Sequence, residues 1–135
     1  MNPRNAGFTL IELVVIIVVL GVLSAVAIPS YINLQDKANQ AAEEATVGNV
    51  RTAIALAYAA AAAEGDPVYP AVLDKAKNGA ASPTNPLFVN VLSQGGVTRD
   101  WEKIDSNSYK GPNRGIYDYK KETGEFLFVK QEKKK

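Results

Sequence analysis

Cysteine and histidine are both absent from this 135-residue chain. Without cysteine, neither a disulfide framework nor a thiolate metal site can form. Without histidine, the chain lacks the commonest general base of enzymes and the commonest ligand of transition metals. The sequence also contains no phosphate-binding loop and no dinucleotide-binding glycine pattern. These absences predict a protein that is not an enzyme and that uses no cofactor.

A surplus of charge of either sign is missing as well. Lysine and arginine number 15 against 14 for aspartate and glutamate, and the formal net charge is +1. Nucleic-acid-binding domains usually carry a clear basic excess, so no nucleic-acid partner is predicted. At this length the chain is too short for two sizeable cores, and we expect one domain with an appendage.

What the chain does have is a long apolar run over residues 8–28, which contains a single charged residue, Glu12. As a helix this run would be about 31 Å long, which matches the hydrocarbon thickness of a bilayer. The run is apolar all round rather than along one face, which disfavours an ordinary core helix of a soluble protein. An isolated strand could not satisfy its backbone groups in lipid. A transmembrane helix is therefore predicted.

Glu12 stands out because a carboxylate inside a membrane segment is costly and usually marks a function. An inert position near the membrane interface is the alternative interpretation. Immediately before the run, the small pair Ala6-Gly7 occupies the place where a peptidase could cut. An ordinary secretory signal has its small-residue site after the apolar region instead. Cleavage after Gly7 would leave the apolar helix on the mature protein.

The stretch Gly7-Phe8-Thr-Leu-Ile-Glu12 closely resembles the processing site of type IV prepilins and type II secretion pseudopilins. In that family a prepilin peptidase cuts after the glycine and methylates the new amino terminus. The resemblance therefore implies cleavage between Gly7 and Phe8, N-methylation of Phe8, and an assembly role for Glu12. Gly21 and Pro29 also match the family pattern, and the resemblance implies a helix hinge at these two residues.

The resemblance divides the chain into a leader peptide (1–7), a transmembrane and assembly half of the helix (8–29), an amphipathic half (30–64) and a small C-terminal region (65–135). Arg4 before the helix favours a cytoplasmic N-terminus under the positive-inside rule. The family implies a single-pass protein of the bacterial inner membrane with an exported C-terminus. Its implied partners are membrane lipid, the prepilin peptidase, an inner-membrane assembly platform and further copies of the chain in a helical filament.

Beyond Pro29 the pattern stays helical, because apolar residues and alanines recur every three or four positions as far as residue 64. Glu43, Glu44 and Arg51 are expected on the other, polar side of this helix. Gly65-Asp66-Pro67 is typical of a helix end. The prediction is one nearly continuous helix of about 55 residues, roughly 80 Å long.

The C-terminal region alternates between loops and short elements. Short helices are expected over 71–77 and 85–92, the second opened by an Asn-Pro pair. Residues 115–120 and 125–130 are rich in aromatic and β-branched side chains. The intervening Lys-Glu-Thr-Gly predicts a hairpin with its glycine in a left-handed conformation. A third strand is expected over 97–101.

Two strands alone are only marginally stable, so the sheet is expected to lean on the apolar face of the long helix. Five aromatic residues are predicted to form the core of that contact: Trp101, Tyr117, Tyr119, Phe126 and Phe128. The expected fold class is α+β and pilin-like, with one long N-terminal helix packed against a small antiparallel C-terminal sheet.

Two further groups of residues, one oxygen-bearing and one aromatic, are not interpreted as functional sites. Oxygen-bearing side chains occur around the C-terminal loops, but their spacing fits no calcium motif, and no metal site is predicted. Aromatic residues on the long helix are interpreted as packing residues rather than as carriers of electrons. The oxygen-bearing set is Asp100, Asp105, Ser106, Asn107 and Asp118, and the helical aromatic set is Phe8, Tyr31 and Tyr58.

The predicted function is that of a structural subunit of a type IV pilus or pilus-like filament, located at the cell surface after assembly. Two alternatives remain open. The first is a pseudopilin of a type II secretion system, which would form a periplasmic pseudopilus with the same N-terminal chemistry. The second is a membrane-tethered binding module, in which the helix is only an anchor and residues 66–135 hold a ligand.

Overall fold

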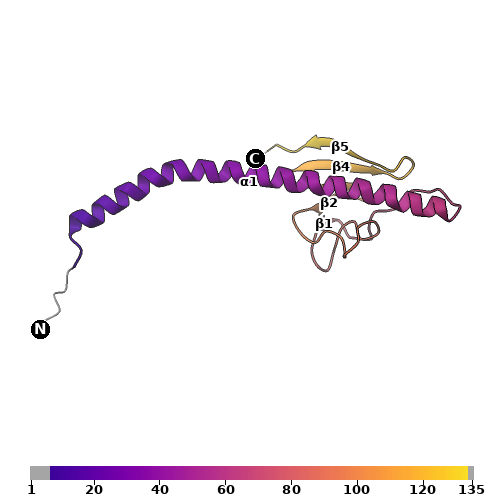
Figure 1. Cartoon of the computed structure of the whole chain (residues 1–135), viewed down its shortest axis with the longest axis horizontal. Helices are drawn as coiled ribbons and strands as arrows, with labels where there is room; N and C mark the ends of the chain where they lie inside the picture. The colour runs from indigo at the N-terminus through magenta and orange to yellow at the C-terminus, as the bar shows by residue number, and fades with distance from the viewer. Residues whose placement is uncertain (1–6, 134–135) are drawn as a thin grey trace, which may run out of the picture. The chain divides into compact units, whose positions relative to one another are not determined.

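The computed structural model describes residues 7–133, so most of the predicted leader, including Arg4, lies outside the described residues. A single long helix is followed by a five-stranded antiparallel sheet, which confirms the predicted α+β class (Figure 1). The chain divides into two compact units between Lys37 and Ala38. The elements are α1 (Leu10–Ala63), β1 (Gly79–Ala80), β2 (Glu102–Lys103), β3 (Ser108–Lys110), β4 (Gly115–Lys120) and β5 (Glu125–Gln131).

Helix α1 contains 54 residues and continues through Pro29 without a break. Its C-terminal end is a Schellman motif, in which the N–H of Asp66 donates to the carbonyl of Ala61 (3.0 Å) and the N–H of Gly65 donates to Ala62 (3.1 Å). Gly65 adopts φ +92°, a conformation that side-chain-bearing residues rarely adopt. The predicted end of the helix is thereby confirmed.

The described part of the first unit, residues 7–37, is exposed throughout and is helical from Leu10 onward. Every residue from Gly7 to Ala38 is exposed, including the large apolar side chains of the run that begins at Phe8. By length and composition alone, α1 is able to cross a membrane. Its apolar N-terminal half therefore offers a continuous hydrophobic surface that requires either lipid or other helices as neighbours.

The second unit contains the core. The strands follow one another in the sheet in chain order, each antiparallel to the next. The predicted hairpin is confirmed as β4 and β5, with Gly124 at φ +70° in its turn, and it runs along the C-terminal half of α1 (Figure 1). The core joins α1 to the sheet and the loops: Val47, Val50, Ile54, Leu73, Leu87, Phe88, Trp101, Tyr109, Tyr117, Tyr119 and Phe126.

Glu43 is not on the polar side of α1, and that expectation was wrong. Its side chain is buried, and its carboxylate accepts hydrogen bonds from the Tyr117 hydroxyl (2.9 Å) and from the N–H groups of Asn113 (2.7 Å) and Gly115 (3.4 Å). A Cβ at Gly111 or Gly115 would collide with this carboxylate. The glycines therefore make room for a polar bridge that ties the β3–β4 loop to the helix.

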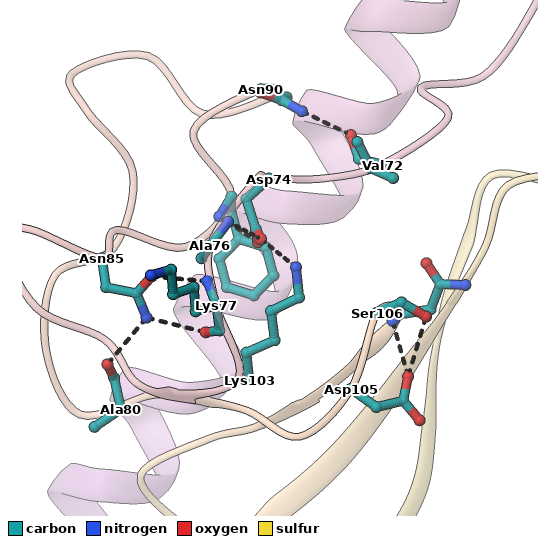
Figure 2. A network of polar contacts seen from close by, with 12 residues as sticks. Val72, Asp74, Ala76, Lys77, Ala80, Asn85, Asn90, Lys103, Asp105 and Ser106 are labelled. Atoms are coloured by element: carbon teal, nitrogen blue, oxygen red, sulfur yellow. Dashed lines mark hydrogen bonds and ion pairs between the residues drawn. The ribbon is translucent and has the colours of Figure 1, made fainter.

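The predicted helices over 71–77 and 85–92 are absent, and both segments are irregular. The buried Asp74 carboxylate accepts from the N–H groups of Ala76 (3.1 Å) and Phe88 (3.0 Å) and pairs with Lys103 at 2.5 Å (Figure 2). Phe88 adopts φ +61°, which a helix interior does not allow. Bonds to the Asp74 side chain, one local and two from residues 14 and 29 positions away, therefore take the place of helical backbone bonds.

Two smaller expectations also fail. The segment 97–101 makes only an isolated bridge, between Leu87 and Val97, while β2 and β3 follow later in the chain. Phe128 is 53% exposed, although its ring meets the ring of Tyr117 at 5.6 Å between centroids. Phe128 keeps the regular register opposite Tyr117, and the register skips Val129, so the regular pairing of β5 is interrupted directly after Phe128.

Candidate functional site at the start of helix α1

The first turn of α1 is held by a reciprocal pair of side chains, Thr9 and Glu12. The Thr9 N–H and hydroxyl donate to Glu12 Oε2 at 2.7 Å and 3.0 Å. In return, the Glu12 N–H donates to Thr9 Oγ1 at 3.3 Å. This arrangement is a capping box, which satisfies backbone donors that have no partner within the helix. The carboxylate is thus fixed at the very start of an apolar helix.

Thr9 was not among the residues singled out from the sequence. The signal was nevertheless present, because a threonine followed three residues later by a glutamate, just before an apolar run, is a known helix-start pattern. Glu12 therefore has two readable features in the sequence, a charge inside an apolar run and the third position of a capping box.

Apolar side chains surround the Glu12 carboxylate on its own face of the helix. Phe8, Ile11, Val15 and Ile16 form with it a shallow concavity of about 360 Å³. The hydrogen bonds to Thr9 use Oε2, and Oε1 takes no part in them. A cation placed here by another molecule would meet a preoriented carboxylate within apolar surroundings.

The predicted cleavage residues Gly7 and Phe8 lie next to each other in an exposed, non-helical segment. Phe8 is 85% exposed. A Cβ built on Gly7 would meet no atom within 4 Å, so the fold itself leaves room for a side chain at this position. Any requirement for glycine must therefore come from a molecule that binds the segment.

The predicted hinge residues lie within an unbroken helix. A Cβ on Gly21 would also meet no atom within 4 Å. Nearby, the Ser24 hydroxyl donates to the carbonyl of Leu20 (2.7 Å) and the Ser30 hydroxyl donates to the carbonyl of Val26 (3.2 Å). Hydroxyls that bond back to carbonyls in this way often bend helices. A hinge at Gly21 and Pro29 stays a prediction.

The oxygen-bearing loop residues are engaged locally. Asp105 accepts from the Ser106 hydroxyl and the Asn107 N–H, and Asp118 accepts from the Ser108 hydroxyl. Within residues 7–133, no group of three or more acidic side chains is arranged as a set of metal ligands.

Comparison with known proteins identifies the N-terminal region. Residues 2–28 match the family model for the prokaryotic N-terminal methylation motif. The motif thus spans the predicted cleavage residues, the capping box and the apolar half of α1. No solved structure gives a significant match to the chain.

Three curated relatives bear names of pilus or fimbrial proteins. The type IV narrow pilus major component PilA5 of Thermus thermophilus is 52% identical over 54 residues, which are 40% of this chain and 47% of that protein. The type IV major pilin protein PilA of Myxococcus xanthus is 42% identical over 52 residues, 38% of this chain and 24% of that protein. The type IV major fimbrial protein FimA of Dichelobacter nodosus is 39% identical over 54 residues, 40% of this chain and 35% of that protein.

The chain thus spans from about a quarter to about half of the length of the relatives that it matches. The N-terminal region of the chain thus carries the prokaryotic N-terminal methylation motif and is similar to the corresponding region of type IV pilins.

Proposed function

We propose that this protein is a structural subunit of a type IV pilus, without catalytic activity of its own. The chain is cut between Gly7 and Phe8 by a prepilin peptidase, methylated at Phe8 and polymerised through α1. The observation that carries this proposal is the methylation motif over residues 2–28, which coincides with an exposed apolar helix. The names of the relatives support a pilus rather than a secretion pseudopilus.

Assembly exchanges one apolar environment for another. Before assembly, the exposed half of α1 is buried in the bacterial inner membrane, with the C-terminal unit exported. Extraction would expose about 20 apolar residues to water unless neighbouring helices replaced the lipid. A bundle of α1 helices in the filament core provides that replacement, so the assembly platform can move subunits from membrane to filament at a modest net cost.

Glu12 sets the register of this bundle. Cleavage after Gly7 creates a positively charged amine on Phe8, which can pair with the Glu12 carboxylate of an adjacent subunit. Because both groups lose water in the apolar bundle, much of their attraction is offset by desolvation. The pair therefore favours the correct alignment of helices over stray packing, and it adds little to the overall stability of the filament.

The processing step is tested by mass spectrometry of the protein extracted from membranes. We expect a mature chain that begins at Phe8 and carries one added methyl group. Gly7→Val should block cleavage, although the fold tolerates a side chain there. A mature chain that still begins at Met1, or one that is cut after Ala27 at the far end of the apolar run, would refute the proposal.

The assembly step is tested with Glu12→Gln and Glu12→Val. Both variants should be cleaved and inserted normally, and both should lower the ratio of sheared filament protein to membrane-pool protein. Glu12→Gln preserves the shape of the side chain, so a strong defect there isolates the ionic pair. Glu44→Gln, at an exposed position later in α1, is the matched control. Parental ratios for both Glu12 variants would rule out the register mechanism.

A further inference from the structure

An uncharged groove runs along one flank of α1 in the second unit. It lies between α1 positions 49–57 and the loop 91–94, and its volume is about 670 Å³. Leu56 is 66% exposed at this groove, and Ala53 and Leu92 line it as well. All of the described residues that line it are uncharged, and most of those on the helix are small.

A second apolar surface lies on the edge strand β5. Leu127, Phe128 and Val129 are 36%, 53% and 51% exposed, and because Leu127 and Phe128 project from opposite faces of the strand, the edge between Glu125 and Lys130 is an uncharged ridge with apolar side chains on both faces. β5 is the last strand in the sheet order, so its outer edge has no strand partner among the described residues. Exposed apolar edge strands readily pair or pack with another chain unless something covers them.

The two surfaces lie on opposite flanks of α1. The buried line of the helix runs through Val47, Val50 and Ile54. At about 100° per residue, Arg51 projects about 70° to one side of this line and Ala53 about 90° to the other. Arg51 donates from Nε to the carbonyl of Phe126 at 3.0 Å, which places β5 on its side. The groove, which contains Ala53, is therefore on the far side from β5.

We propose that the β5 ridge (Leu127, Phe128 and Val129) of one subunit packs into the α1 groove of the next subunit. This inference rests on the proposed function, because it describes how polymerised copies contact each other outside the bundle of apolar helices. A contact between two different surfaces of the same chain generates an open helical filament whenever its rotation does not close into a ring. A self-paired β5 edge would instead close a dimer and cover both ridges.

The occupant of the groove is a second copy of this chain for two reasons. The groove is concave and uncharged, with alanine and leucine side chains beside the polar Asn49, Thr52, Ser93 and Gln94, and the ridge is an uncharged projection of bulky side chains, so neither surface brings a charge into the contact. Their positions on opposite flanks also let every copy offer a ridge and accept one at once. Packing them together removes exposed apolar side chains from water on both partners, which favours association.

The absence of natural cysteine allows a direct crosslinking test. Cells that assemble the filament would carry Leu56→Cys together with Val129→Cys, and sheared filaments would be oxidised and analysed on non-reducing gels. We expect a ladder of dimers, trimers and larger species. Each single variant should remain monomeric. The matched control, Leu56→Cys with Ser106→Cys in the exposed β2–β3 turn, should also give no ladder.

Several outcomes would overturn the contact while leaving the proposed function intact. Normal filaments of the double variant without crosslinks would exclude it, and dimers from Val129→Cys alone would show edge-to-edge pairing instead. A parent chain that is never cleaved and never forms filaments would refute the proposed function itself.

If the cysteine variants do not assemble, the contact is tested instead by introducing opposite charges on the two surfaces. Leu56→Lys and Val129→Glu singly should each lower filament yield at least about tenfold, because each would place an unpaired charge in an apolar contact. Together they should restore the yield to within about twofold of the parent, since the two charges would then face each other. A double variant no better than the weaker single variant would overturn the proposed contact.

Discussion

Replacement of the buried Glu43 is expected to weaken the attachment of the sheet to α1. Its carboxylate accepts bonds from the Tyr117 hydroxyl and from two backbone N–H groups, those of Asn113 and Gly115. Glu43→Gln keeps the length of the side chain but turns an NH₂ group toward at least one of these donors. Hydrogen bonds to charged groups contribute about 1.5–3 kcal/mol each, so we expect a loss of about 2–4 kcal/mol in the free energy of unfolding.

Glu43→Ala removes the acceptor altogether and leaves two buried donors, the Gly115 N–H and the Tyr117 hydroxyl, and the half-buried Asn113 N–H without this partner. We expect a loss of about 3–5 kcal/mol, in the range measured when one partner of a buried charged network is deleted. For a unit of this size, a loss of about 2–4 kcal/mol corresponds to a decrease in Tm of about 10–20 °C.

The assay is thermal unfolding of the full chain in detergent, followed by the fluorescence of Trp101, the only tryptophan and a buried one. Glu44→Gln is the control, since Glu44 is exposed and bonds only to Gln40 in the part of the chain that the structure describes. Its free energy of unfolding should change by no more than about 0.5 kcal/mol, the range of ordinary surface substitutions. Equal Tm values for the Glu43→Gln, Glu44→Gln and parent chains would refute the bridging role of Glu43.

Three further predictions concern the helix and the core. Pro29→Ala should restore a helical hydrogen bond and alter filament diameter or yield without affecting membrane insertion. If circular dichroism in detergent and filament diameter are both unchanged, Pro29 has no hinge role. Thr9→Val removes the hydroxyl of the capping box, so amide hydrogen exchange in the first turn of α1 should accelerate about fivefold, and an unchanged rate would argue against the cap. Burial raises the pKa of Tyr109, Tyr117 and Tyr119. The folded state holds these protons more tightly than the unfolded state does, so the tyrosines contribute fully to the free energy of unfolding below the ordinary tyrosine pKa of about 10. As the pH rises above that value, this contribution falls by up to about 1.4 kcal/mol per pH unit for each tyrosine. Alkaline unfolding measured together with tyrosinate absorbance checks this, and ionisation of all three near pH 10 without loss of structure would contradict it.

The long helix, its end at Gly65, the cleavage motif and the β4–β5 hairpin were all predictable from the sequence. Each of these features depends on signals between residues close in the chain: an apolar run, a glycine at a helix end, fixed offsets around Gly7, and a short turn between two strands. Such signals act through local backbone preferences and hydrophobic periodicity, which a single sequence displays directly.

The roles of Glu43, Asp74 and Phe128 were decided only by the tertiary structure. Glu43 lies 70 or more residues from the donors that it binds, and Asp74 lies 29 residues from Lys103. A charged residue on a helix is normally placed in solvent by sequence reasoning, because burial without a partner is costly. The partners that remove that cost come from distant segments, and Phe128 stays exposed although it lies opposite the buried Tyr117 in the sheet. The local pattern therefore determined the elements, whereas the contacts between distant residues determined which polar groups are buried and which apolar surfaces stay exposed.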